Sequence, residues 1–131
     1  MENGAAAERD QGDTVLLVVD DDPRMRQTIR WALEDEGLLV ETAADGRQAI
    51  DCAMRRRPAL VVLDIGVPIF NGYEVAAALR EKYGDGLPIL TVTADGRAAE
   101  KAQQVGAFAH LPKPFEVDDL VAAVRRGLNG V

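Results

Sequence analysis

Five polar residues stand where predicted strands end, and their side chains are of the kinds that bind metal ions and phosphate. The five residues are Asp20, Asp21, Asp64, Thr93 and Lys113. An aspartate after a strand is by itself a common turn residue, and threonine is frequent in strands. Turn preference does not account for such residues at four of five strand ends in one short chain. We therefore interpret them as one group.

Together these residue types predict metal-assisted phosphoryl chemistry. Carboxylates brought within several Å of one another repel, and a cation or a proton must offset that repulsion. A group of carboxylate oxygens with an open face is what Mg²⁺ binds, usually with water and a phosphate oxygen. Lys113 adds a compact positive charge and Thr93 a hydroxyl donor, which would stabilise charge developing on a phosphoryl group. A carboxylate in such surroundings can act as a nucleophile and form an acyl phosphate.

A repeated strand–helix pattern must position these residues. Apolar or alternating runs at 15–19, 38–42, 60–63, 89–92 and 107–111 predict five strands. Apolar residues at helical spacing predict a helix after each strand, with Pro23, Asp45 and Asp95 as start signals for three of them. Alternating units of this kind predict an α/β fold with a doubly wound, parallel five-stranded sheet between two helix layers. Binding sites in such sheets lie beyond the carboxyl ends of the strands.

Length, charge and cysteine content exclude several classes of protein. The 131 residues suit one domain. With 15 basic and 22 acidic residues the net charge is −7, which disfavours nucleic acid and anionic membrane surfaces as direct partners. Cys52 is the only cysteine, so an internal disulfide and a cysteine-based zinc site are excluded. No apolar stretch approaches the roughly 18 residues of a membrane-spanning helix.

The N-terminal segment differs in composition from the rest of the chain. Residues 1–13 are acidic and rich in small residues, without the apolar run of a signal peptide. We expect residues 1–13 to be a disordered tail and residues 14–131 to form the phosphoacceptor domain. We also expect a cytoplasmic location.

Four short segments, in order along the chain, resemble the receiver domain of two-component response regulators. They are Leu17–Asp21, Asp64–Pro68 with Gly72, Thr93–Ala94, and Lys113–Phe115. Each segment alone is weak evidence, but four in register are specific, and the match runs from Val15 to about Leu128. The resemblance implies the flavodoxin-like, CheY-like (βα)5 fold with strand order 2-1-3-4-5. That order comes from the resemblance and not from the pattern of elements.

The resemblance also implies a role for each residue at the site. Asp64 matches the phosphorylated aspartate and contributes to Mg²⁺ binding. Asp21 matches a direct Mg²⁺ ligand, Asp20 a residue that contributes mainly through water, and Gly66 a ligand through its backbone carbonyl. Lys113 matches the lysine that pairs with the phosphoryl group, and its bond to the following proline matches the family's cis peptide.

A conformational switch and a set of partners follow from the same resemblance. Thr93 matches the switch hydroxyl, and His110 stands where the family has a switch aromatic residue. His110 is predicted either to act as that switch or to stay exposed without a role. The implied partners are a sensor histidine kinase or histidine phosphotransfer protein and a downstream effector. The effector would bind the surface around Thr93, His110 and the last helix, and a homodimer formed on phosphorylation is compatible with the pattern.

The sequence departs from the family pattern at Val67 as well as at His110. Val67 replaces the usual methionine, which we interpret as an exchange of one apolar side chain for another. Gly66 and Asp95, each two positions after a site residue, occupy positions that tune hydrolysis in this family. Because Gly66 offers no side chain to shield the site, we expect a short-lived phosphate. Asp22, one step past the acidic pair, is expected to face solvent or cap the next helix.

Three alternatives stay open at this point. A phosphohydrolase of the haloacid dehalogenase type would also use an Asp-x-Asp motif, but Arg24 stands where it needs threonine or valine. A flavin-binding protein of the same topology would need a phosphate loop in place of the acidic residues after the first strand. A degenerate receiver would serve only as a binding module, although all five site positions are intact. Whether the domain acts alone or within a longer regulator is also open.

Overall fold

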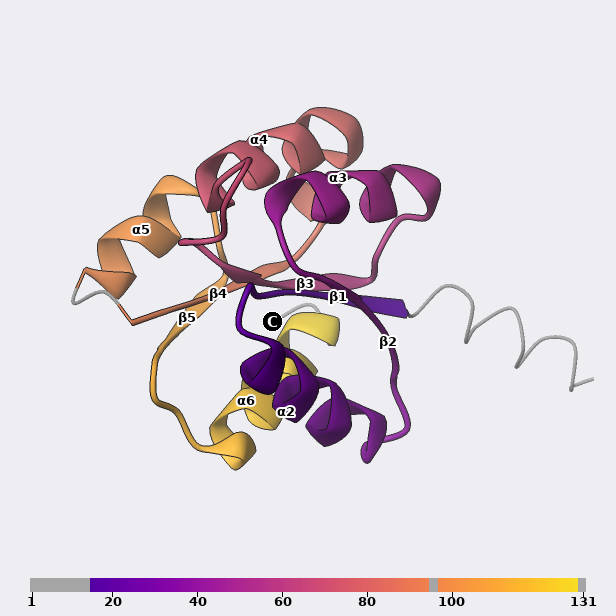
Figure 1. Cartoon of the computed structure of the whole chain (residues 1–131), viewed down its shortest axis with the longest axis vertical. Helices are drawn as coiled ribbons and strands as arrows, with labels where there is room; N and C mark the ends of the chain where they lie inside the picture. The colour runs from indigo at the N-terminus through magenta and orange to yellow at the C-terminus, as the bar shows by residue number, and fades with distance from the viewer. Residues whose placement is uncertain (1–14, 95–96, 130–131) are drawn as a thin grey trace, which may run out of the picture.

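The computed structural model describes residues 15–94 and 97–129, and five parallel strands form one sheet within them. The strands are β1 (Val15–Val19), β2 (Leu39–Ala43), β3 (Leu60–Asp64), β4 (Ile89–Thr93) and β5 (Ala109–Pro112). Their order across the sheet is β2-β1-β3-β4-β5, which confirms the order implied by the family resemblance (Figure 1).

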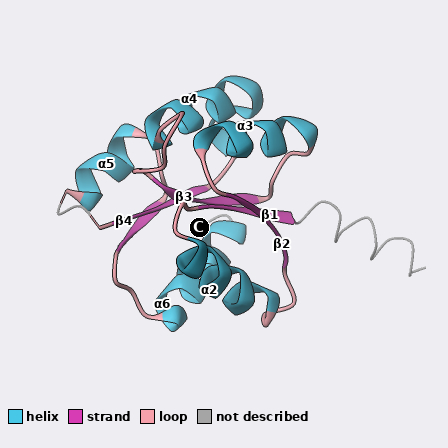
Figure 2. Cartoon of the chain, viewed as in Figure 1, coloured by secondary structure: helices cyan, strands magenta, loops and turns pink. Residues whose placement is uncertain are grey.

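Helices cover both faces of the sheet, as the alternating pattern predicts (Figures 1 and 2). They are α2 (Pro23–Glu34), α3 (Gly46–Arg55), α4 (Gly72–Tyr83), α5 (Ala98–Gln104) and α6 (Val117–Leu128), with a short 3₁₀ turn at Gly84–Gly86. Helices α3, α4 and α5 lie on one face, and α2 and α6 lie on the other. The three-layer, doubly wound architecture is therefore confirmed.

The core consists of two apolar layers separated by the sheet. Strands β1 and β3 are buried along their whole length, which explains why they are unbroken apolar runs. Leu17 and Val19 pack towards α3 and α4, whereas Leu16 and Val18 pack towards α2 and α6. Because β2 is an edge strand and only partly buried, its sequence alternates instead.

The helix start signals are confirmed where the structure describes them. Asp22 caps α2 by accepting a hydrogen bond from the backbone N–H of Arg24 at 2.9 Å, and Pro23 follows as the first helical residue. Asp45 caps α3 by accepting from the backbone N–H of Gln48 at 2.8 Å. Asp95 and the N-terminal tail lie outside the described residues. None of the helices in the described ranges is long and apolar enough to cross a membrane.

The loop between β3 and α4 is held against the start of α3 by a backbone contact that only glycine allows. The backbone N–H of Gly46 donates to the carbonyl of Pro68 at 3.1 Å. A Cβ on Gly46 would lie 1.7 Å from the carbonyl oxygen of Phe70, well inside van der Waals contact. At the tip of the same loop, Ile69 has a φ of 72°, and its side chain is 69% exposed. The loop that follows Asp64 is thus positioned by α3.

We expect Gly46→Ala to destabilise the protein by about 2 kcal/mol or more, because overpacking commonly costs about 1–3 kcal/mol. Alanine gains roughly 1 kcal/mol of helix propensity over glycine, which is too little to offset the clash. Urea unfolding measures the change. Gly86→Ala is the matched control, because its Cβ would meet only Arg57 Nη2, at 3.9 Å. Equal stabilities for the two variants would contradict this account of the loop.

Candidate functional site

The sheet brings the predicted site residues together at the carboxyl ends of its strands. Asp20 follows β1, Asp64 ends β3, Thr93 ends β4 and Lys113 follows β5. Strand β1 pairs with β3, and β4 pairs with both β3 and β5, so these ends are neighbours in space. Carboxylate oxygens of Asp20, Asp21 and Asp64 lie within 4.8 Å of one another. Five residues spread over 94 positions of sequence thus converge on one edge of the sheet.

Lys113 is the positive charge that faces this acidic cluster. Its Nζ donates to Asp20 Oδ2 at 2.7 Å and to Asp64 Oδ2 at 3.0 Å. The backbone N–H of Lys113 donates to the carbonyl of Thr93 at 2.8 Å, which anchors the segment after β5 to the end of β4. The Lys113–Pro114 peptide bond is cis, as the resemblance implies. One ammonium group therefore joins the two carboxylates that follow the central strands.

Asp20 is the most enclosed of the carboxylates, with no exposed surface. Burial raises the pKa of Asp20 above its ordinary value, and this outweighs the hydrogen bonds from Lys113 and from the backbone N–H of Asp22. The Asp22 N–H donates to Asp20 Oδ1 at 2.9 Å, and Arg26 Nη1 donates to the Asp20 backbone carbonyl at 2.9 Å. Two donors, Lys113 Nζ and the Asp22 N–H, thus hold a carboxylate whose charge burial disfavours.

The two carboxylates shift the ionisation of Lys113 in the opposite sense to burial. Burial alone would lower the pKa of the Lys113 ammonium. Its hydrogen bonds and charge interactions with Asp20 and Asp64 outweigh that effect, so the pKa is raised. Lys113 therefore stays positively charged beside the cluster at neutral pH.

Asp64 lies between the enclosed and the open parts of the cluster. Its Oδ2 accepts from Lys113, and its Oδ1 accepts from the backbone N–H of Gly66 at 3.0 Å. Asp64 is 7% exposed, whereas Asp21 is exposed. The site therefore has a buried end at Asp20 and an open end at Asp21.

This donor set fits Mg²⁺. The ligand atoms are hard carboxylate oxygens, close together and open to water on one side, which suits an ion that keeps several of its waters. One lysine balances only part of the negative charge of three carboxylates, so a divalent cation would relieve the remaining repulsion. The individual ligand roles expected of Asp20, Asp21 and the Gly66 carbonyl stay predictions.

The expected switch residues have different exposures. Thr93 is buried, with 5% of its surface exposed, at the end of β4 beside the acidic cluster. His110 is exposed on β5, opposite Thr91 in the sheet register. Of the two predicted environments for His110, the structure has the exposed one, and its role as a switch stays a prediction. Val67 is buried, in keeping with a simple apolar exchange.

Two residues that support the site were not found from the sequence. Arg26 holds the backbone carbonyl of Asp20 from one turn into α2, and no spacing rule identifies such a contact. Gly46 positions the loop after Asp64, although Gly46 is remote in sequence. The Asp45-Gly46 pair at a predicted helix start is a local signal, but it indicates only a helix cap at Asp45.

Comparisons with known proteins identify relatives along most of the chain. The family model for the response regulator receiver domain matches residues 16–125. The response regulator MprA of Mycolicibacterium vanbaalenii is 44% identical over 112 residues, which are 84% of this chain and 48% of MprA. The chain thus spans about half the length of the curated relatives it matches.

Solved structures show the same fold. The response regulator TrrA from Thermotoga maritima, crystallised in complex with Mg²⁺ and BeF, has a TM-score of 0.79 and 32% identity, over 87% of this chain and 98% of TrrA. The receiver domain of the sensor histidine kinase PA1611 from Pseudomonas aeruginosa has a TM-score of 0.81 and 29% identity. It covers 88% of this chain and 98% of that domain, and its structure holds a magnesium ion in the active site cleft.

We expect Mg²⁺ to raise the melting temperature, because a ligand at about 100 times its dissociation constant adds about 2.7 kcal/mol to the free energy of unfolding. Differential scanning fluorimetry with and without MgCl₂, at constant ionic strength, measures the shift. Asp21→Asn should remove most of it. Asp51→Asn is the matched control, since Asp51 is an exposed carboxylate paired with Arg47 on α3. A full Mg²⁺ shift in Asp21→Asn would show that the ion binds elsewhere.

Proposed function

Because the chain belongs to the response regulator receiver domain family, we propose that Asp64 accepts a phosphoryl group in a Mg²⁺-dependent reaction and that the domain then alters a partner-binding surface. The observation that carries the proposal is the crowding of three carboxylates against one lysine at the mouth of the sheet. The Mg²⁺ and BeF bound to TrrA and the magnesium ion in PA1611 support the same chemistry here.

Exposure and contacts favour Asp64 over the other two carboxylates as the nucleophile. The Asp20 side chain is 0% exposed, so an incoming phosphorus atom has no path to it. The Asp21 side chain is open to solvent, but no hydrogen bond joins it to Lys113 among the described residues. The Asp64 side chain is 11% exposed and in contact with Lys113, so it combines access with a neighbouring positive charge.

In the proposed reaction, an Asp64 oxygen attacks phosphorus, the P–N bond of a phosphohistidine breaks, and the imidazole leaves with the bonding electrons and takes up a proton. Lys113 and the Thr93 hydroxyl stabilise the charge on the phosphoryl oxygens. The Gly66 N–H fixes the orientation of the carboxylate through Asp64 Oδ1. Bound Mg²⁺ would neutralise the negative charge of the reacting groups. In the second half of the cycle, water attacks phosphorus and the P–O bond to Asp64 breaks. Inorganic phosphate and a proton are released, and the Asp64 carboxylate is regenerated.

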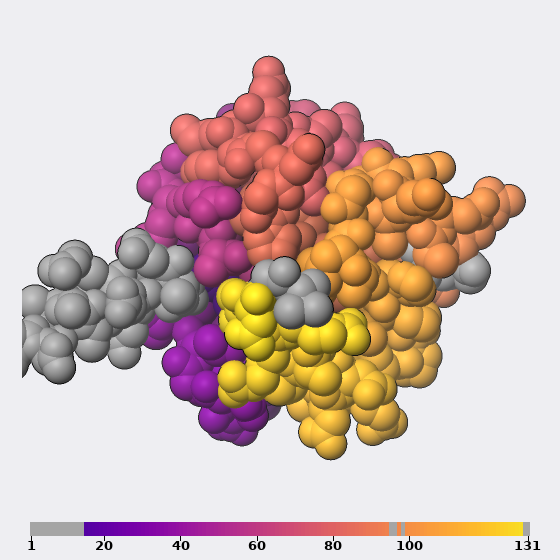
Figure 3. Space-filling view, turned by 180° about the vertical axis from the view of Figure 1, so that it is seen from behind, coloured from indigo at the N-terminus to yellow at the C-terminus, as the bar shows by residue number. Residues whose placement is uncertain are grey.

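The proposed partners follow from the same family. The phosphodonor is a sensor histidine kinase or a histidine phosphotransfer protein, and the effector binds the surface of α5, β5 and α6. Figure 3 shows that the orange segment containing α5 and β5 adjoins the yellow α6 on one face of the molecule. The end of β4 lies beside β5 in the sheet, so a movement of Thr93 reaches this surface directly. The same surface would serve a phosphorylation-dependent homodimer.

We expect Asp64→Asn to abolish labelling by acetyl phosphate in the presence of Mg²⁺, because the amide is a poor nucleophile. Electrophoresis that separates phosphorylated from unphosphorylated protein measures the loss, which should exceed about a hundredfold, as for other removed catalytic groups. Asp51→Asn should be labelled as well as the unchanged protein. Labelling of Asp64→Asn at the normal rate would refute the assignment of the phosphoacceptor.

We expect Gly66→Asn to lengthen the lifetime of the phosphate several-fold. A Cβ at Gly66 would lie 3.7 Å from Asp64 Oδ1, so a larger side chain there would cover the approach of water. Gly66 is not among the glycines with positive φ, so its backbone accepts a side chain. The decay of phosphorylated protein at neutral pH measures the effect, with Gly86→Asn as the control. An unchanged or shorter lifetime would count against shielding by this position.

A further inference from the structure

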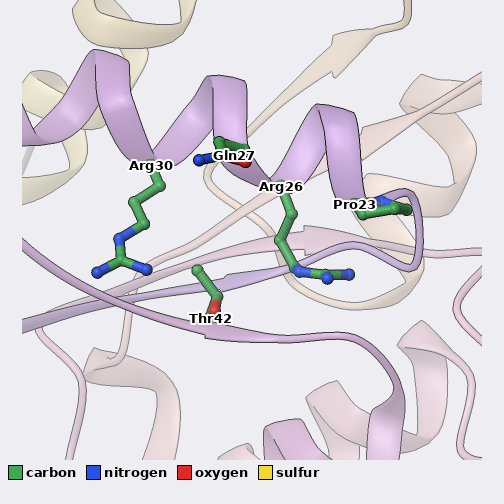
Figure 4. A pocket seen from close by; sticks show the side chains of 5 residues that line it. All are labelled: Pro23, Arg26, Gln27, Arg30 and Thr42. Atoms are coloured by element: carbon green, nitrogen blue, oxygen red, sulfur yellow. The ribbon is translucent and has the colours of Figure 1, made fainter.

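A polar groove with two arginines lies between α2 and the edge strand β2, next to the acidic cluster but lined by none of its carboxylates. Its volume is about 210 Å³, and it is lined by Pro23, Arg26, Gln27, Arg30 and Thr42. Figure 4 shows the side chains of Arg26 and Arg30 extending from α2 towards β2, on either side of Thr42. Neither the sequence patterns nor the phosphorylation chemistry assigns a role to this groove.

Each of the two guanidinium groups uses only one of its N–H donors within the described residues. Arg26 donates from Nη1 to the backbone carbonyl of Asp20, and Arg30 donates from Nε to Glu34 Oε2 at 3.0 Å. Their other N–H groups have no hydrogen-bond partner within residues 15–94 and 97–129. A guanidinium presents its N–H groups as a planar fork that matches the oxygens of phosphate and carboxylate. Thr42 and Gln27 add a hydroxyl and an amide to the lining.

The sheet keeps the carboxylate of β2 out of the groove. Glu41 pairs with Leu17, which packs in the layer of α3 and α4, whereas Thr42 pairs with Val18, which packs in the layer of α2 and α6. Successive side chains of a strand point to opposite faces, so Glu41 lies on the far side of the sheet from Arg26 and Arg30. Glu34 balances part of the charge of Arg30, so Arg26 and the remaining N–H groups of Arg30 supply the positive charge of the groove, on a chain whose net charge is −7.

We propose that this groove binds a small anion that bears a phosphate or carboxylate group, held by Arg26 and Arg30 in front of Thr42. The volume is below the roughly 300–1,000 Å³ of pockets for drug-sized ligands, so the occupant is small. Arg26 also holds the backbone of Asp20, so the anion lies beside the acidic cluster without sharing its ligands. The proposal does not depend on phosphorylation of Asp64.

Titration of the full chain by NMR tests the proposal, with the side-chain Nε–Hε signals of Arg26 and Arg30 as probes. Inorganic phosphate and succinate are added separately, without Mg²⁺ and at an ionic strength held constant with NaCl. We expect saturable shifts of both signals, with a dissociation constant in the millimolar range. Shifts with phosphate alone would identify a phosphorylated ligand, shifts with succinate alone a carboxylate, and shifts with both the shared chemistry.

Variants separate binding in the groove from general screening of charge. Arg30→Gln should weaken binding about tenfold, the loss expected for one charge-assisted hydrogen bond, as followed by the Arg26 signal. Arg47→Gln is the matched control, because Arg47 is an exposed arginine on α3 that pairs with its neighbour Asp51. Equal affinity in Arg30→Gln and the unchanged protein would overturn the proposal, as would shifts that NaCl alone reproduces.

Discussion

The site depends on electrostatic repulsion that the protein only partly relieves. Three carboxylates lie within reach of one another, and Lys113 contacts two of them. Two further lysines would balance all three carboxylates and leave a salt-bridge cluster with no affinity for a divalent cation. The deficit of positive charge is what gives the cluster an affinity for a divalent cation and for the phosphoryl group that accompanies it. The unbalanced negative charge therefore lowers the stability of the free protein but allows it to bind a divalent cation and a phosphoryl group.

Such repulsion is tolerable only on a rigid support. Asp20 follows β1 and Asp64 ends β3, two interior strands of the sheet that are buried along their whole length. Backbone hydrogen bonds on both sides and helices on both faces prevent these strand ends from moving apart. The more exposed residues lie farther from this support: Asp21 is one residue farther along the loop after β1, and His110 is on the edge strand β5. The buried strand ends thus hold Asp20 and Asp64 in place, while Asp21 and His110 remain accessible to solvent.

The alternation of strands and helices and the polar members of the site were predictable because they depend on local sequence patterns, whereas the strand order came from the family resemblance. Buried parallel strands are continuous apolar runs, and the residue that ends such a run is necessarily at the carboxyl edge of the sheet. The pairing of Lys113 with both Asp20 and Asp64 was not predictable from spacing, since it depends on the path of the chain after β5. The roles of Arg26 and Gly46 were not predicted either, because each depends on a contact with a backbone carbonyl outside its own helix.

The loop after Asp64 also has an unusual tip. Ile69 occupies the left-handed region of backbone conformation, where a β-branched side chain costs of order 1–3 kcal/mol. Because the side chain is largely exposed, the hydrophobic effect contributes little to offset this cost. Natural sequences retain many residues that are not the most stable choice for their position. Here the penalty falls on a side chain that supports no part of the core. Position 69 is thus a place where evolution or protein engineering can exchange side chains, even for asparagine or glycine, and gain folding stability while the sheet stays intact.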